Sequence, residues 1–185
     1  MRKIILWNVL TLDGYFEGEK PWDLSFHGLV WGPELEALSL EQLQEADMLV
    51  FGKNTYLGMA DYWPKAKEKE AALMNSIAKG VCSSSLQKAD WNNTTIIRDA
   101  VSELTRLKEQ GGKPMYIFGS GKLTQSLMST GIIDEIRLCI APILLGKGRR
   151  LFSDESTTRH LKLLESRSLQ KGGVIQRYST TPEHQ

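Results

Sequence analysis

Residues that suit phosphate binding follow three short apolar runs of this 185-residue chain. The three sets are Gly52, Lys53, Asn54 and Thr55, then Ser83, Ser84 and Ser85, and then Gly119, Ser120, Gly121, Lys122 and Leu123. Glycine lets the bare backbone approach a ligand, and the N–H groups at a helix N-terminus attract an anion. Each set alone is ordinary turn chemistry. Together, their lysines and hydroxyls favour a site for a nucleotide that carries a phosphorylated ribose.

A second group of residues suits the binding of a flat ligand. Trp22, Phe26, His27 and Trp31 lie in a loop between residues 17 and 33 that has no clear periodicity. Such a loop is either a satellite of the core or the wall of a ligand pocket. His27 titrates near neutral pH, so it is a candidate proton donor. Asp13 is a second candidate, although an Asp in a turn after a strand commonly bonds backbone instead.

The elements that must position these residues alternate along the chain. Strands are expected over residues 3–10, 46–51, 80–82, 94–97, 115–118 and 132–145, with a closing hairpin over residues 161–169 and 174–178. Helices are expected from residue 33, over the charged residues 65–79, after Asp99 and over residues 122–130. The alternation predicts an α/β fold. In such a sheet the carboxyl ends of the strands share one edge, where ligands bind.

Composition excludes several classes of partner. The net charge is +1 and no basic run stands out, which argues against nucleic acid. No segment approaches a membrane span, and the short apolar start predicts a first strand, not a signal peptide. Cys82 and Cys139 have no neighbours at metal-ligand spacing, so we expect reduced thiols, no metal and a cytoplasmic protein. The length predicts one domain over residues 1–180, with a frayed end over residues 181–185.

The choice between NADH and NADPH is predicted from the lack of an acidic residue after the first glycine turn. Dinucleotide sites for NAD(H) use an acidic residue to hold the free 2′-hydroxyl of the ribose. No acid follows Gly52, whereas Lys53 does. This favours NADPH over NADH.

Several motifs carry a family resemblance that spans nearly the whole chain. They are LTLDGYFEG, PWDL, ADMLVFGKNTYLGM, YWP, FGSGKL and STGIIDEIRLCIAPILLGKGRRLF. Together they resemble the dihydrofolate-reductase-like superfamily, and most of all the C-terminal reductase domain of the bifunctional riboflavin-biosynthesis deaminase/reductase and its stand-alone relatives. The resemblance implies a three-layer fold, with helices on both faces of a mostly parallel mixed sheet of about eight strands. It also implies NADPH as hydride donor and a homodimer that pairs through the sheet region of residues 132–145.

The resemblance also assigns roles residue by residue. Lys53 and Thr55 would hold the adenosine-side phosphates, and Ser83 and Ser84 the end with the 2′-phosphate. Residues 119–123 would hold the pyrophosphate. Trp31 would line the nicotinamide side.

The chain departs from both known branches of the superfamily in its substrate contacts. His27 stands where a dihydrofolate reductase has a carboxylate, and Ile77 lies near the place of the arginine that holds folate. An arginine expected around Gln44 and an acid expected at Phe118 are also missing relative to riboflavin reductases. We therefore expect a flat pocket of low charge lined by Trp22, Phe26 and Phe118. Arg149 or Arg150 is needed if the substrate carries a phosphate.

The function predicted from the sequence is NADPH-dependent reduction of a C=N or similar bond in a small heterocycle. It resembles 5-amino-6-(5-phosphoribosylamino)uracil reductase of riboflavin biosynthesis. A proton for the substrate nitrogen would come from His27 or Asp13. The alternatives are a dihydrofolate or pterin reductase, a non-catalytic NADP-binding module and a purely structural dimer.

Overall fold

The computed structural model describes residues 1–152 and 158–181, which build an eight-stranded sheet in the order β5-β4-β3-β6-β1-β7-β10-β9. Its strands are β1 (Ile4–Thr11), β3 (Met48–Gly52), β4 (Ala78–Cys82), β5 (Thr94–Ile97), β6 (Met115–Phe118), β7 (Glu135–Ala141), β9 (Lys162–Ser168) and β10 (Val174–Ser179). β10 runs antiparallel to β7 and β9, and the other pairs are parallel. The predicted mostly parallel mixed sheet is confirmed.

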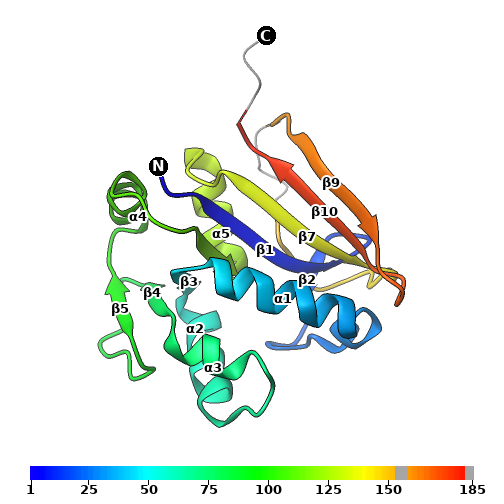
Figure 1. Ribbon diagram of the computed structural model, residues 1–185, viewed down its shortest axis with the longest axis horizontal. Helices are drawn as coiled ribbons and strands as arrows, with labels where there is room; N and C mark the ends of the chain where they lie inside the picture. The colour runs from blue at the N-terminus through cyan, green and yellow to red at the C-terminus, as the bar shows by residue number, and fades with distance from the viewer. Residues whose placement is uncertain (153–157, 182–185) are drawn as a thin grey trace.

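Helices cover both faces of the sheet, as expected for the three-layer fold (Figure 1). They are α1 (Pro33–Glu45), α2 (Lys53–Tyr62), α3 (Ala71–Ser76), α4 (Ala100–Glu109) and α5 (Gly121–Thr130). One core contains Leu35 of α1, Tyr56 of α2 and Met74 of α3, whereas the other contains Leu104 of α4 and Leu127 of α5. The first three helices therefore share one face and the last two share the other.

Short elements complete the chain beside the main sheet. They are β2 (Tyr15–Glu17), which pairs with β8 (Arg149–Arg150), and the 3-10 turns η1 (Ser25–Leu29) and η2 (Trp63–Lys65). The β2–β8 pair follows the carboxyl end of β1, and η1 packs near β7. These elements bring the aromatic loop to the same edge of the sheet as the end of β1. No helix in the described ranges is long and apolar enough to cross a membrane.

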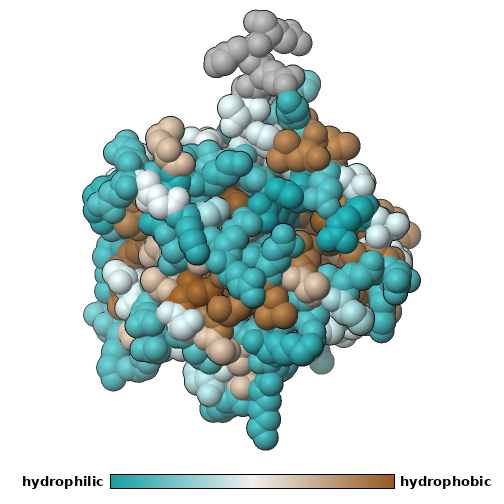
Figure 2. Space-filling model, viewed as in Figure 1, coloured by the Kyte–Doolittle hydropathy of each residue, from teal (hydrophilic) through white to brown (hydrophobic). Residues whose placement is uncertain are grey.

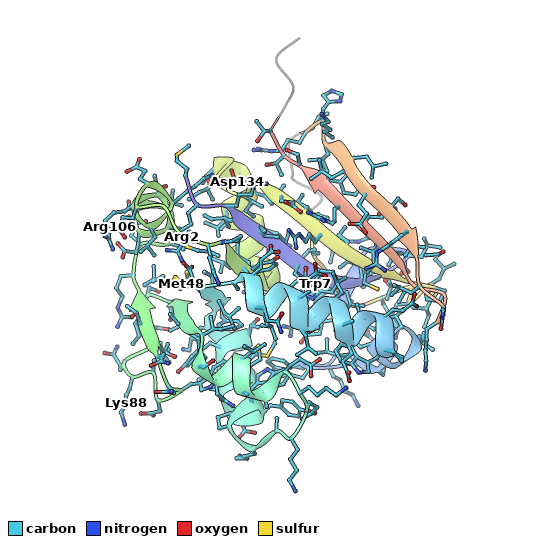
Figure 3. The ribbon with its side chains drawn as sticks, viewed as in Figure 1. Arg2, Trp7, Met48, Lys88, Arg106 and Asp134 are labelled. Atoms are coloured by element: carbon cyan, nitrogen blue, oxygen red, sulfur yellow. The ribbon has the colours of Figure 1, made fainter. Side chains whose placement is uncertain are left out.

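Strand β1 is the centre of the sheet because β6 and β7 flank it in parallel. All eight of its residues are buried, which agrees with the near-continuous apolar run IILWNVLT. Trp7 lies on the face covered by α1 (Figure 3) and pairs in register with Phe118 of β6. The apolar run alone therefore predicted a central strand correctly.

Two predicted elements differ in the structure. Residues 65–79 were expected to form a solvated helix, but only α3 is an α-helix there, and Glu70 and Lys79 are buried. The Nζ of Lys79 donates to the backbone carbonyls of Asn75, Ile77 and Asn92, so this lysine closes a turn instead of facing water. The strand expected over residues 132–145 is also shorter, because β7 spans only Glu135–Ala141.

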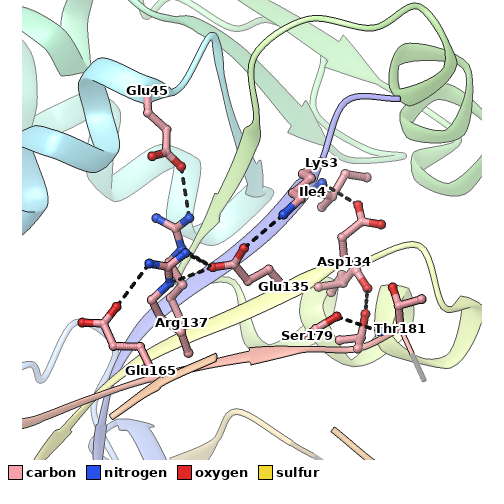
Figure 4. Close-up of polar contacts among 12 residues, drawn as sticks. Lys3, Ile4, Glu45, Asp134, Glu135, Arg137, Glu165, Ser179 and Thr181 are labelled. Carbon is pink, nitrogen blue, oxygen red and sulfur yellow. Dashed lines mark hydrogen bonds and ion pairs between the residues drawn. The ribbon is translucent and has the colours of Figure 1, made fainter. Parts of the chain in front are cut away.

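A charged network crosses the uncovered part of the sheet on the α1 side (Figure 4). Nε of Arg137 and Nε of Arg177 both donate to Glu135, at 2.7 and 2.9 Å. Arg137 also donates to the hydroxyl of Tyr116 at 2.5 Å, and that hydroxyl donates to Glu45. The Glu135 carboxylate is 3% exposed, so two arginines compensate for one buried negative charge.

Burial raises the pKa of the Glu135 carboxyl, but hydrogen bonds and charges from Arg137 and Arg177 outweigh it and hold the pKa below the usual value. A lowered folded-state pKa stabilises the fold above the unfolded value of about 4.3, and this contribution is lost as the pH falls through the folded pKa. Glu135 is therefore one source of acid sensitivity.

We predict that Glu135→Gln lowers the free energy of unfolding at pH 7 by about 3 kcal/mol, because it removes the charge that two arginines share. The free energy of unfolding of this variant should also decrease less steeply below pH 4.5 than that of the native protein. Urea unfolding followed by tryptophan fluorescence from pH 3 to 7 measures both effects. Glu103→Gln is the matched control, since its solvent-exposed pair with Arg106 should contribute far less to stability. Equal losses in the two variants would contradict the assigned role of Glu135.

Candidate active site at the carboxyl edge of the sheet

The three sets of predicted phosphate-binding residues meet at one edge of the sheet. Gly52 ends β3 and pairs in register with Cys82, the residue before Ser83. β3 is also parallel to β6, which ends at Phe118 just before Gly119. Parallel pairing thus places the turn after β3 between the turns after β4 and β6.

Two helices begin at neighbouring points of this edge. The residues before their first turns are Gly52 for α2 and Ser120 for α5, and neither helix has a side-chain cap. The first N–H groups of each helix have no intrahelical acceptor and so remain available to an anion. The backbone N–H of Gly52 donates to Oγ of Ser120 at 2.9 Å, which ties the two helix starts together.

The turn after β6 has an unusual backbone that leaves little room for side chains. Gly119 and Ser120 both have left-handed φ angles, of 60° and 64°. Ser120 Oγ also donates to the carbonyl of Phe118 at 3.2 Å, which holds this strained residue in place. A Cβ at Gly119 would lie 3.3 Å from Thr55, and a Cβ at Gly121 only 2.6 Å from Phe16. The glycines therefore permit the close approach of α2, α5 and β2.

Cations surround this edge without carboxylate partners. Lys53 Nζ donates to Oγ of Ser85 at 3.0 Å, and Arg98 Nη1 donates to the carbonyl of Ser83 at 2.8 Å. Lys122 is exposed in the first turn of α5. None of the three forms an ion pair with a residue of the described ranges. Helix N-termini, hydroxyls and these cations together fit the phosphates of a dinucleotide.

Sequence reasoning missed Arg98 and Trp7. Arg98 directly follows β5, so its position after a fourth parallel strand was the available signal. Trp7 faces the α1 side of the central strand, next to Phe118, whose ring stacks on Tyr116 with centroids 5.8 Å apart. Nothing distinguished this tryptophan in the sequence from an ordinary strand residue.

The aromatic loop is partly core and partly exposed surface. Phe26 is 2% exposed and belongs to the core, so its ring offers little surface to a ligand. Trp22 and Trp31 are 42% and 43% exposed. Trp22 has a left-handed φ of 66°, and its indole lies on Gly58 of α2, where a Cβ would come within 1.9 Å. Phe26 therefore belongs to the core, whereas Trp22 and Trp31 are exposed enough to line a ligand pocket.

His27 and Asp13 occupy different electrostatic environments. Burial lowers the pKa of the His27 imidazole to about 4, and its Nε2 has no hydrogen-bond partner in the described part of the chain. The hydroxyl of Thr11 and the backbone N–H groups of Gly146 and Leu145 hold the pKa of Asp13 near 2. At neutral pH the imidazole is therefore uncharged, whereas Asp13 is an ionised acceptor that fixes the loop after β7.

Arg149 and Arg150, which form β8, are already bonded to residues in or next to β2. Arg149 forms an ion pair with Glu17 at 3.2 Å, and Arg150 donates to the carbonyl of Asp13 at 3.2 Å. Both cysteines are free thiols, and burial raises the pKa of each to about 12. Within residues 1–152 and 158–181, no three His, Cys, Asp or Glu side chains gather as a metal ion requires.

Comparisons with known proteins agree with this geometry. The chain is 29% identical to the uncharacterized protein YyaP of Bacillus subtilis over 182 residues, which cover 94% of this chain and 92% of YyaP. A putative riboflavin biosynthesis protein from Shewanella sp. PV-4 has the same fold, with a TM-score of 0.81, 20% identity and coverage of 97% and 99% of the two chains. The dihydrofolate reductase of Enterococcus faecalis, solved with NADP(H), gives a TM-score of 0.64 at 12% identity, over 97% of each chain.

These two structural likenesses establish a dihydrofolate-reductase-like fold and leave the reaction open, because their sequence identities are low. The family model for the RibD C-terminal domain is more specific, since it matches residues 2–175 and so includes every strand and turn of the edge described above. The suspected resemblance is therefore confirmed, and the chain belongs to the RibD C-terminal domain family, whose members are reductase-like.

Proposed function

We propose that this protein is an NADPH-dependent reductase of a small heterocyclic substrate, similar to 5-amino-6-(5-phosphoribosylamino)uracil reductase. One observation carries the proposal. The uncapped starts of α2 and α5 are joined by the bond from Gly52 N–H to Ser120 Oγ. Lys53, Arg98 and Lys122 surround them, and none of these cations pairs with a carboxylate of the described residues. This arrangement supports binding of a dinucleotide with an additional phosphate.

The proposed roles follow from this placement. The first N–H groups of α5 bind the pyrophosphate, while Lys53, Ser83, Ser84 and Arg98 bind the 2′-phosphate. When bound, NADPH supplies a hydride to the substrate. Trp31 lines the nicotinamide side, and Trp22 and Phe118 exclude water from the substrate ring.

We assign the proton that accompanies hydride transfer to His27. The Asp13 carboxylate, with its pKa near 2, carries no proton to give at neutral pH and instead positions the backbone of Leu145 and Gly146. The imidazole of His27 has a pKa near 4, so its protonated form becomes common only in acid. The rate of a reaction that needs this proton should therefore depend on pH.

A homodimer is also proposed, but through another strand than the sequence predicted. Both edges of β7 are bonded, to β1 and β10, so this strand cannot pair with a second copy. Within the described ranges β9 is the last strand of the sheet, and Leu161, Leu163 and Leu164 at and before it are 41 to 55% exposed. Figure 2 shows hydrophobic surface at this corner of the molecule. Antiparallel pairing of two β9 strands about Ser166 sets Glu165 opposite Arg167 of the second copy, so the edge is self-complementary in charge.

The first prediction from the proposed function concerns cofactor choice. Lys53→Ala should weaken NADPH by on the order of 1–3 kcal/mol and leave NADH unchanged, because only NADPH carries the 2′-phosphate. Fluorescence titration of both nucleotides measures this difference. Lys65→Ala is the control, since Lys65 lies beyond the other end of α2 and pairs with Asp61. Equal affinity of the native protein for NADPH and NADH would rule out the proposed phosphate site.

The second prediction concerns the proton. With a substrate found by screening pyrimidines and pterins, kcat should rise as the pH falls from 7 toward 5, because more His27 is protonated. His27→Gln should remove this rise and leave the Kd of NADPH unchanged. A native pH profile that is flat, or one that His27→Gln preserves, would show that the proton comes from elsewhere.

The third prediction concerns assembly. Light scattering at micromolar concentration should give twice the chain mass of 20.8 kDa. Arg167→Glu should yield monomers by opposing like charges, and the double variant Glu165→Arg with Arg167→Glu should restore the dimer. A native mass of one chain, or a double variant that stays monomeric, would argue against pairing through β9.

A further inference from the structure

The turn between β9 and β10 carries a lysine to the start of α1. Leu169 N–H donates to the carbonyl of Gly173 at 2.7 Å, and Gly172 N–H to the carbonyl of Leu169 at 2.9 Å, which closes the turn. The N–H of Gln170 donates to the Glu34 carboxylate at 2.6 Å. Residues 169–173 are thereby held against the first turn of α1, although more than 130 residues separate them in the sequence.

Two glycines allow this contact. A Cβ at Gly32 would lie 3.3 to 3.6 Å from three carbons of the Lys171 side chain, so the lysine stem passes over Gly32. A Cβ at Gly173 would come within 2.8 Å of Val30 and 3.2 Å of Cys139. The stem of Lys171 thus lies on the backbone directly after Trp31, and Gly173 of the same turn packs against Val30 directly before it.

The ammonium group of Lys171 has no bonding partner in the part of the chain that the structure describes. No residue in the described ranges accepts a hydrogen bond from its Nζ or forms an ion pair with it. Arg149 and Arg150, the cations expected from the sequence to serve a substrate phosphate, are bonded to Glu17 and the Asp13 carbonyl, and the nearby Lys147 pairs with Glu19. Lys171 therefore supplies the available positive charge beside Trp31.

We propose that Lys171 is a specificity residue, which selects substrates with a flat ring and an anionic tail. This inference rests on the proposed function, since it places the substrate ring near Trp31. The exposed indole of Trp31 offers a flat apolar surface, and the ammonium beside it offers one charge-assisted hydrogen bond. A phosphate or carboxylate on the substrate would accept a hydrogen bond from that ammonium and compensate its charge. A neutral ring alone would leave the ammonium hydrated.

The Glu34 carboxylate opposes an anion at this place. It lies beside Lys171 through its bond to Gln170 N–H, and its negative charge weakens the attraction of Lys171 for an anionic tail. Removing this charge while keeping the hydrogen bond should strengthen anion binding. Lys171→Ala and Glu34→Gln therefore have opposite expected effects, which a general loss of structure would not produce.

Uridine 5′-monophosphate and uridine are suitable probes because they differ only in the phosphate. Quenching of tryptophan fluorescence in the full chain, saturated with NADP⁺, measures the Kd of each. We expect the monophosphate to bind about ten- to one-hundredfold tighter, the range for one hydrogen bond to a charged group. Lys171→Ala should remove this preference, Lys171→Arg should keep it and Glu34→Gln should raise it, while the Kd of uridine stays unchanged.

Lys53→Ala separates this site from the proposed cofactor site. If the preference for the monophosphate disappears in Lys53→Ala and persists in Lys171→Ala, the phosphate binds at the helix starts and the inference is wrong. Equal binding of both probes by the native protein, or binding of neither at millimolar concentration, also overturns it. Titration of NADPH in the same variants reports separately on the proposed function, because Lys171→Ala should leave its Kd unchanged.

Discussion

The hydrogen bond between the Gly52 N–H and Ser120 Oγ is the contact on which the candidate site depends. It exists because β3 and β6 are parallel neighbours that end at the same level, so α2 and α5 begin side by side. Ser120 accepts this bond in a left-handed conformation, which costs of order 1 to 3 kcal/mol in backbone strain. Two hydrogen bonds to its hydroxyl hold that conformation, so the strain is retained where a ligand's phosphates would contact bare N–H groups.

Charge is distributed differently at the two ends of the sheet. At the carboxyl edge, Lys53 donates to a hydroxyl, Arg98 donates to a carbonyl and Lys122 is exposed, and no described carboxylate compensates their positive charge. At the opposite end, Glu135 is shared by Arg137 and Arg177 within a closed network. A compensated network contributes to stability but attracts no ligand, whereas uncompensated cations attract anions. Whether a cation here stabilises the fold or can bind a ligand therefore depends on whether it is paired with a carboxylate, and not on whether it is Lys or Arg.

The sequence predicted what depends on local order and missed what depends on distant contacts. Apolar runs bounded by glycine identified β1, β3 and β6, and Asp99 does cap α4 through its bond to Ser102 N–H. The prediction for residues 65–79 was wrong, because alternating Lys and Glu indicate a solvated helix. The sequence does not show that Lys79 is buried and donates to the carbonyl of Asn92. Lys171 gave no signal either, since its importance comes from Glu34 and Gly32.

The positions of the helix starts and of Lys171 suggest how one sheet edge could bind the phosphates of a cofactor and the anionic tail of a substrate at separate places. The helix starts after β3 and β6 share a set of exposed cations with the turns after β4 and β5, whereas Lys171 reaches the edge from the β9–β10 turn beyond β7. β1, with Trp7 next to Phe118, lies between these two regions in the strand order. A dinucleotide bound at the first region would therefore extend its uncharged ring toward the aromatic centre, where the ring of a substrate held by Lys171 would meet it. A centre of low charge would suit the proposed reaction, because hydride transfer between two flat rings needs contact and the exclusion of water.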